Sequence, residues 1–354
     1  MSDVAAAAST SPRLTSLSHG GGCGCKIAPG VLANLLSGVG GGVRPPELLV
    51  GSETADDAAV YRLNDEQAIV ATTDFFMPIV DDPFDFGRIA ATNALSDVYA
   101  MGGTPILALA LVGMPINVLP AETIREILRG GEAVCTAAGI PIAGGHSIDS
   151  VEPIYGLAAL GVVHPQKLKR NGGAQPGDAI VLGKPIGVGV LSAALKKEKL
   201  DAAGYEAMIA ATTLLNRAGS PLAQIAGVHA MTDVTGFGLL GHLLEMCRAS
   251  GLGAQLRYAD VPLIAGVAEL AQAGLVTGAS ARNWSSYGSD VRLSAKLAPT
   301  AQALLCDPQT SGGLLVACAP DSVAGVIAAF ERFGCTQAAA IGHFVAGEAQ
   351  VAVN

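Results

Sequence analysis

The stretch His164-Pro-Gln-Lys-Leu-Lys-Arg-Asn-Gly-Gly-Ala-Gln-Pro-Gly-Asp178 interrupts the regular patterns of the chain. A basic patch, Lys167, Lys169 and Arg170, leads into Asn-Gly-Gly and then Gln-Pro-Gly-Asp, and these residue types favour turns. A new apolar run begins directly afterwards, at Ala179. Because 354 residues suffice for two domains of ~100 to 200 residues each, we predict the domain boundary at this stretch.

On both sides of this boundary, short apolar runs alternate with longer amphipathic ones. The runs of strand length are 68–71, 106–114, 154–163, 179–182 and 313–317. The runs with helical spacing are 86–101, 121–138, 206–218, 238–249 and 322–333. This mixture predicts an α/β (α+β) fold of two mixed domains. We expect a disordered tail over residues 1–17, an N-terminal domain over 18–163 and a C-terminal domain over 164–354.

The composition excludes several classes of protein. The net charge of −9 opposes the binding of a phosphate backbone, so we expect no nucleic acid partner. Prolines and glycines interrupt the uncharged stretch 98–121, whose apolar part 106–114 is too short to span a bilayer, so we expect no membrane span. The seven cysteines are odd in number and mostly scattered, and no secretory signal is visible, which predicts the reducing cytoplasm.

Two glycine-rich segments could bind phosphate through bare backbone amides. The first, residues 20–26, ends in Lys26 but is not a Walker A loop, because Lys26 follows Cys25 and precedes Ile27. It cannot be regular structure and we expect a mobile loop. The second is Gly144-Gly-His-Ser147, which we interpret as a glycine turn. A tight turn with a capping serine is the simpler explanation of the second segment.

Several carboxylates stand where apolar segments end or within an apolar helix, and they are Asp56, Asp57, Asp74, Asp97 and Asp233. Such carboxylates suit Mg²⁺, a hard cation that is held by one or two side chains together with phosphates. Each also has a structural alternative. Asp233 could cap a helix, Asp56 could form an Asx-turn, and Asp97 could lie on the polar side of its helix.

Cys23 and Cys25 adjoin Lys26 in the first glycine segment, where we expect an exposed loop and a thiol pKa lowered by the lysine. The alternative is a metal clip with His19 as a third ligand, although a structural zinc site generally needs four ligands. The other cysteines are interpreted as small buried hydrophobic residues. His242, on an apolar helix face, is interpreted as a core histidine.

A series of motifs runs in order from about Leu14 to the C-terminus. They are Gly20-Gly-Gly-Cys-Gly-Cys-Lys26, Glu53-Thr-Ala-Asp-Asp-Ala-Ala-Val60, Thr72-Thr-Asp-Phe75, Asn93-Ala-Leu-Ser-Asp-Val-Tyr-Ala-Met-Gly102, Gly144-Gly-His-Ser-Ile-Asp149, Thr232-Asp-Val-Thr-Gly-Phe-Gly238 and Asp307-Pro-Gln-Thr-Ser-Gly-Gly313. This set resembles selenophosphate synthetase (selenide, water dikinase), of the aminoimidazole ribonucleotide synthetase-like superfamily. The Asp-Asp-Ala-Ala-Val run is shared across the superfamily, whereas the Cys-Gly-Cys-Lys loop is specific to the selenium enzyme.

The resemblance implies that ATP, selenide and water are converted to selenophosphate, AMP and phosphate, with several Mg²⁺ ions per ATP, to supply selenium for selenocysteine and selenouridine. It implies that Cys23 is the essential thiol and that Lys26 is catalytic and contacts ATP. It implies that Mg²⁺ is held at Asp57, Asp97 and Asp233. The implied ATP contacts, besides Lys26, are Thr54, Ala55, Asp56, Asp74, Asp97, Gly145, His146 and Ser147.

The resemblance also implies a cytoplasmic homodimer in which the N-terminal sheet forms an intersubunit barrel and the C-terminal α/β domain covers the nucleotide. A selenium-delivery protein is a further expected partner. Two alternatives remain open at this point. One is another ATP-dependent enzyme of the superfamily, such as a thiamine-phosphate kinase, and the other is a non-catalytic protein that binds soft metals through Cys23 and Cys25. The role of residues 307–313 is also open.

Overall fold

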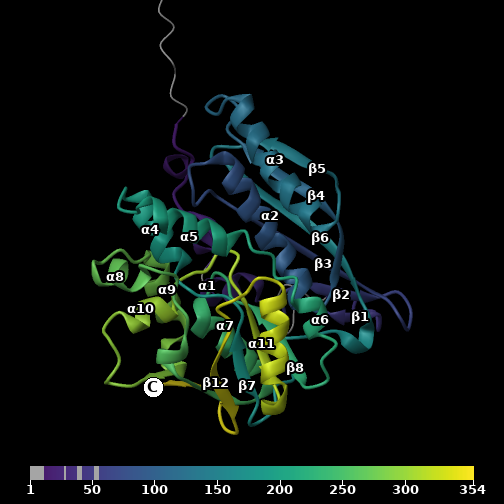
Figure 1. Ribbon diagram of the computed structural model, residues 1–354. Helices are drawn as coiled ribbons and strands as arrows, with labels where there is room; N and C mark the ends of the chain where they lie inside the picture. The colour runs from purple at the N-terminus through teal and green to yellow at the C-terminus, as the bar shows by residue number, and fades with distance from the viewer. Residues whose placement is uncertain (1–11, 28, 38–41, 52–55) are drawn as a thin grey trace, which may run out of the picture.

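The computed structural model describes residues 12–27, 29–37, 42–51 and 56–354. Two sheets, each with its own helices, lie one above the other in Figure 1, with the N-terminal half at the top. The mixed α/β fold class predicted from the sequence is therefore confirmed. No helix within the described residues combines the length and the apolar character needed to cross a bilayer.

The N-terminal half is built on a six-stranded sheet with the order β1-β2-β3-β6-β4-β5. Its strands are β1 (Leu48–Val50), β2 (Ala59–Arg62), β3 (Ala68–Phe76), β4 (Thr104–Met114), β5 (Ile142–Asp149) and β6 (Ile154–Val163). Neighbouring strands are antiparallel except for β4 and β5. Because a parallel pair needs a crossover connection, the helix α3 (Ala121–Ala138) joins these two strands.

One face of this sheet is covered by α3 and by α2 (Pro83–Ala100), which lie side by side in Figure 1. Asp82 caps α2 by accepting a hydrogen bond from the backbone N–H of Asp85. The two helices touch backbone to backbone, since a Cβ at Gly87 would lie 1.9 Å from the carbonyl oxygen of Ile127. Ile127 is fully buried, which confirms the predicted amphipathic covering helix at 121–138.

The opposite face of the six-stranded sheet exposes large apolar side chains. Phe75 on β3 is 54% exposed, and Ile106 and Leu109 on β4 are also exposed. Beside them, Ile148 on the edge strand β5 is 57% exposed. Large exposed apolar patches of this kind often mark an interaction surface.

The C-terminal half is built on a seven-stranded sheet with the order β10-β13-β9-β12-β7-β11-β8. Its strands are β7 (Ala179–Leu182), β8 (Val228–Asp233), β9 (Gly253–Leu256), β10 (Val291–Leu293), β11 (Leu314–Cys318), β12 (Ala339–Val345) and β13 (Val351–Val353). The pairs of β13 with β10 and with β9 are parallel, and the others are antiparallel.

Helices enclose the central strands of this sheet on both faces. The described helices outside α2 and α3 are α1 (Pro29–Leu36), α4 (Val188–Lys196), α5 (Ala202–Thr212), α6 (Gly219–Leu222), α7 (Gly238–Ser250), α8 (Val267–Gln272), α9 (Gly278–Tyr287), α10 (Ala301–Leu305) and α11 (Val323–Arg332). On β7, Ile180 shares a core with Leu243 of α7, while Val181 shares a different core with Phe330 of α11. Successive side chains of a strand point to opposite faces, so β7 is apolar throughout.

Most predicted elements are found, with some shifts. The bounds predicted for β6, β7 and α3 are those observed, whereas β3 continues beyond Ala71 to Phe76. The helix predicted at 206–218 is wrong in its bounds, because α5 begins at Ala202 and ends at Thr212. Within the predicted tail, residues 1–11 lie outside the described part. Leu14–Leu17 nevertheless form a 3₁₀ turn in which Leu14 is buried, so ordered chain begins earlier than expected.

Candidate active site

The glycine loop, residues 20–26, contains a 3₁₀ turn at Gly22–Cys25 and places Cys23 against both halves of the chain. The backbone N–H of Cys23 donates to Thr310 Oγ1 at 3.0 Å, and its Sγ donates to Asn93 Oδ1 at 3.3 Å. Gly22 has φ +53°, and a Cβ there would lie 2.2 Å from Thr310 Oγ1. Glycine is therefore required at this position by both the backbone conformation and the space.

Cys23 is 1% exposed, so the expectation of an exposed thiol with a lowered pKa is wrong. Burial raises the pKa of the Cys23 thiol well above its usual value, and the nearby Lys26 only partly opposes that effect. Burial also raises the pKa of Cys25, whose Sγ donates to the carbonyl oxygen of Gly22 at 2.8 Å. The thiols are therefore protonated in this conformation.

The metal-clip alternative finds no support in the described part of the chain. There, no three His, Cys, Asp or Glu side chains gather as a metal-holding group. His19 instead pairs with Glu152, with Nδ1 2.9 Å from Oε2. The remaining cysteines are buried and free, as predicted. The His242 side chain is also buried, with 5% of its surface exposed.

Lys26 reaches from the glycine loop to Asp74, which is buried at the end of β3. The distance from Lys26 Nζ to Asp74 Oδ2 is 3.4 Å, and Asn93 Nδ2 donates to the same oxygen at 2.5 Å. Desolvation alone would lower the pKa of Lys26, but the negative groups around it, with Asp74 the strongest, raise that pKa well above its ordinary value. Lys26 is therefore a permanent cation beside Cys23.

Asp57, Asp97 and Asp233 are brought together from the loop before β2, from α2 and from the end of β8. Each accepts a hydrogen bond from a hydroxyl group: Asp57 from Thr232 at 2.8 Å, Asp97 from Thr72 at 2.5 Å and Asp233 from Ser96 at 2.5 Å. The first and last of these bonds join the two halves of the chain. Asp233 ends a strand, and the N-cap residue of α7 is Phe237, so the helix-cap alternative for Asp233 is wrong.

The carboxylate set, Asp57, Asp97 and Asp233, fits a divalent cation. Burial, and then the repulsion of Asp233, raises the pKa of both Asp57 and Asp97 well above the usual value, and burial raises the pKa of Asp233 too. Among the described residues, the buried Oδ2 of Asp57 has no hydrogen-bond partner. These oxygens do not form a complete metal cage by themselves, as is usual where Mg²⁺ shares its ligands with phosphates.

An open depression of about 420 Å³ lies beside this set, over β2, β3 and β6. Asp56, Asp57 and Thr72 line it. Asp56 Oδ1 accepts a hydrogen bond from the backbone N–H of Asn171 at 2.7 Å, so Asp56 ties the depression to the stretch that links the two halves. Thr54 and Ala55, the other predicted ATP contacts in this segment, lie outside the described residues.

Gly145, His146 and Ser147 do not form the predicted glycine turn. They lie within β5, an exposed edge strand in which Gly145 pairs with Ala110. A Cβ at Gly145 would lie 2.2 Å from the carbonyl oxygen of Ala110, so the glycine permits close strand pairing rather than a turn. Because β6 and β4 lie between them, β5 is about 14 Å from β3 by strand spacing alone.

The sequence reasoning did not single out the polar residues that join the site together, which are Asn93, Ser96, Thr232 and Thr310. Asn93, Ser96 and Asp97 stand three and four residues apart on α2, and this spacing could have placed them on one helix face. The segment 307–313, whose role was open, is buried against the site: its Ser311 N–H donates to Asn93 Oδ1 at 2.6 Å.

Comparisons with known proteins identify the family. The family models described as AIR synthase related protein, N-terminal and C-terminal domain, match residues 55–163 and 175–354. A selenide, water dikinase of Burkholderia pseudomallei (strain K96243) is 72% identical over 97% of both chains. Another of Paraburkholderia xenovorans (strain LB400) is 67% identical over the full length of both.

Solved structures share the fold at low sequence identity. A thiamine-monophosphate kinase from Stenotrophomonas maltophilia K279a aligns with a TM-score of 0.64 and 21% identity, over 88% of this chain and 92% of the other. AaThiL complexed with AMPPCP and TMP aligns with a TM-score of 0.65 and 18% identity, over 92% and 93%. The two-domain fold is thus shared with these kinases, and by its full-length similarity the chain belongs to the selenide, water dikinase family.

Proposed function

We propose that this chain converts ATP, selenide and water to selenophosphate, AMP and phosphate, at the site that Cys23, Lys26 and the carboxylate set form. It is a phosphotransferase by its family, and selenophosphate would serve as activated selenium for selenocysteine and selenouridine. The observation that carries the assignment of the site is the contact network of the glycine loop. Cys23 and Lys26 are joined through Asn93 and Asp74, so the thiol and the ammonium act at one place.

Lys26 is the group that would neutralise charge on a phosphoryl group in transfer. Its ammonium lies in a partly enclosed site, where electrostatic stabilisation is stronger than in water. The glycine loop covers that site and would exclude water while selenide attacks. Mg²⁺, held by Asp57, Asp97 and Asp233, would offset the repulsion between the phosphates of ATP and these carboxylates.

ATP is proposed to lie in the depression beside Asp56, near Asp74 and Asp97, with Thr54 and Ala55 as further contacts. A protein of the same fold is complexed with AMPPCP, an ATP analogue, so this fold is compatible with a bound nucleotide. Gly145, His146 and Ser147 lie on β5, which β6 and β4 separate from β3 in the same sheet. In a dimer, the second copy of the chain would supply these residues to the nucleotide.

We propose a homodimer that covers the exposed face of the six-stranded sheet. Phe75, Ile106, Leu109 and Ile148 would be buried in it. The free edge of β5 would also be protected, since an exposed edge strand is a pairing site for other chains. The seven free cysteines support the reducing cytoplasm as the compartment, and a selenium-delivery protein remains a proposed partner.

One anaerobic assay tests the proposed reaction. The protein is incubated with Mg-ATP and selenide, and AMP is measured together with the ³¹P NMR signal of a phosphorus–selenium bond. Selenide-dependent AMP with that signal is the expected result. Untouched ATP, or ADP as the final product, would contradict the proposal. Asp233→Asn should raise the Mg²⁺ concentration needed for half-maximal rate, and an unchanged requirement would remove Asp233 from the metal site.

A further inference from the structure

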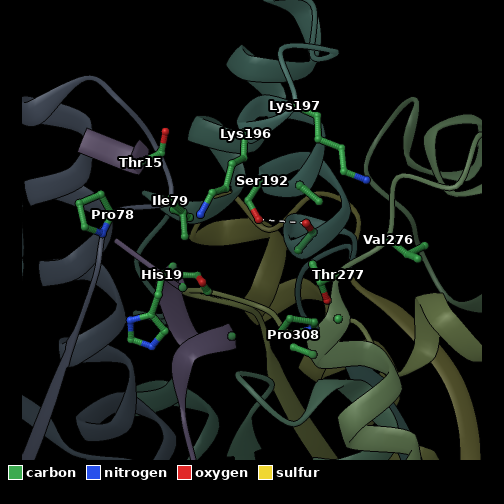
Figure 2. Close-up of a pocket in the computed structure, with 18 of the residues that line it drawn as sticks. Thr15, His19, Pro78, Ile79, Ser192, Lys196, Lys197, Val276, Thr277 and Pro308 are labelled. Carbon is green, nitrogen blue, oxygen red and sulfur yellow. Dashed lines mark hydrogen bonds between the residues drawn. The ribbon is translucent and has the colours of Figure 1, made fainter. Parts of the chain in front are cut away.

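A cavity of about 300 Å³ lies on the outer side of the glycine loop, between this loop and the C-terminal half. Gly20, Gly21 and Gly24 of the loop form one wall, and residues of α4 and α9 form the other (Figure 2). Thr310, which accepts the hydrogen bond from the Cys23 N–H, also lines it. The cavity therefore adjoins the segment that holds Cys23 in place.

The lining of this cavity is basic. Lys196 and Lys197, at the end of α4, and Arg282 of α9 contribute cations, and none of the described lining residues carries a carboxylate. In Figure 2 the Lys196 side chain extends toward Ile79 and Ser192, while Lys197 extends along the rim toward Val276. The carboxylate set lies on the inner side of the same loop, so the two sides of the loop carry opposite charge.

One of these cations holds the backbone of the loop, because Arg282 Nη2 donates to the carbonyl oxygen of Gly24 at 3.2 Å. Lys196 Nζ donates at 3.2 Å to the carbonyl oxygen of Ser18, which precedes the loop. Both side chains are nevertheless largely exposed, so they retain donors for a ligand. The contacts fix the loop between the cavity and the carboxylates.

A second, smaller cavity of about 10 Å³, the size of one water molecule, lies beside the reactive groups. Cys23 and Lys26 line it, and it shares Gly24, Ala279 and Arg282 with the larger cavity. Arg282 thus lines both cavities. The smaller one would have to widen to admit an anion that moves past Arg282 toward Cys23 and Lys26.

We infer that the basic cavity binds the selenium substrate as a small anionic donor and that Arg282 passes it to Cys23. This inference rests on the proposed function. Hydroselenide is an anion at neutral pH. The carboxylates and the ATP phosphates would repel it, whereas the cations of the cavity attract it.

The test uses two cavity variants, Lys197→Gln and Arg282→Gln, with Lys199→Gln as the matched control. Lys199 follows the same helix but lines a different depression, beside Leu200 and Glu269. The KM for hydroselenide should rise about tenfold or more in the double cavity variant, with the KM for ATP unchanged. Lys199→Gln should behave as the wild type, and Arg282→Lys should restore part of the loss. An equal KM for selenide in all variants would overturn the inference.

Binding measured without ATP separates this inference from the reaction itself. Hydroselenide binding is measured by equilibrium dialysis under anaerobic conditions. Weaker binding in the double variant supports the cavity even if no selenophosphate forms. Unchanged binding contradicts the cavity even if the enzyme is active.

Discussion

The glycine loop and the segment 144–147 are both rich in glycine, yet they do different things in the fold. Each combines glycines with a thiol or a small polar side chain. The glycine loop is buried against Thr310 and Asn93, where positive φ at Gly22 turns the backbone. The segment 144–147 is an exposed strand, where absence of a Cβ at Gly145 lets two backbones meet. Glycine therefore marks close backbone approach in both, and the neighbouring residues decide between a turn and a strand.

The largest expected effect separates the two cysteines of the glycine loop. Cys23→Ser should lower selenide-dependent AMP formation by at least about a thousandfold, as loss of an essential catalytic group does. Cys25→Ser should be milder, because Cys25 Sγ donates to the loop's own backbone at Gly22. Rates of AMP release check both variants. An equal loss in both would favour a shared metal or disulfide role for the pair.

A smaller effect is expected when the turn in the glycine loop is strained. In Gly22→Ala the new Cβ would overlap Thr310 Oγ1. The positive φ at this position also costs any residue other than glycine ~1 to 3 kcal/mol. We expect kcat to fall roughly 10- to 100-fold, the rate equivalent of that energy. Gly24→Ala is the control, since its Cβ would meet ordinary contacts at 3.5 Å. Equal rates for the two variants would mean that the turn at Gly22 does not position Cys23.

The strand segment should respond in stability more than in chemistry. In Gly145→Ala the Cβ would lie 2.2 Å from the carbonyl oxygen of Ala110, so β5 must shift away from β4, at about 1 to 3 kcal/mol. Thermal unfolding measures this. Gly144→Ala has a similar backbone angle, but the new Cβ would lie 4.0 Å from Leu109, an ordinary contact, and it should be better tolerated. A Tm equal in both variants would show that the edge strand yields freely.

The smallest effect on activity is expected at Asp307, which begins the buried segment behind the glycine loop. Burial raises the pKa of its carboxyl to about 7, from a model-peptide value of 3.8. The native state thus favours the protonated form, so this group's contribution to stability is complete below pH 3.8 and is lost as the pH rises to about 7. Asp307→Asn keeps an acceptor for the Gly189 N–H but cannot titrate.

For Asp307→Asn we therefore expect AMP formation within about twofold of the wild type at neutral pH, since Asp307 acts only through its segment. The fall in Tm between pH 4 and pH 7 should be shallower in the variant than in the wild type. Unfolding curves across this range check the prediction. Parallel curves would mean that Asp307 is ionised throughout.

The regular elements could be predicted from the sequence where apolar periodicity is strong. The strand Ile154–Val163 and the helix Ala121–Ala138 have the predicted bounds because alternation or helical spacing is sustained along them. The short strands Val291–Leu293 and Val351–Val353 were missed since three residues carry no periodicity. Residues 144–147 were misinterpreted because paired glycines usually indicate turns.

The candidate site could be predicted in its charged residues but not in its geometry. Asp57, Asp97 and Asp233 stand out because carboxylates are rare among apolar neighbours. The burial of Cys23 could not be predicted, because it depends on Thr310, which is far away in sequence, and the basic cavity likewise needs α4 and α9 to be placed beside the loop. Contacts between distant segments carry no local sequence signal.

The burial of Cys23 also bears on how the protein survives contact with air. Oxidation to sulfenic acid requires a thiolate that peroxide can reach. With its pKa raised and its sulfur enclosed by the glycine loop, Cys23 offers neither while the loop is closed. The thiol that we propose as essential is thus held in a reduced, protected form in this conformation.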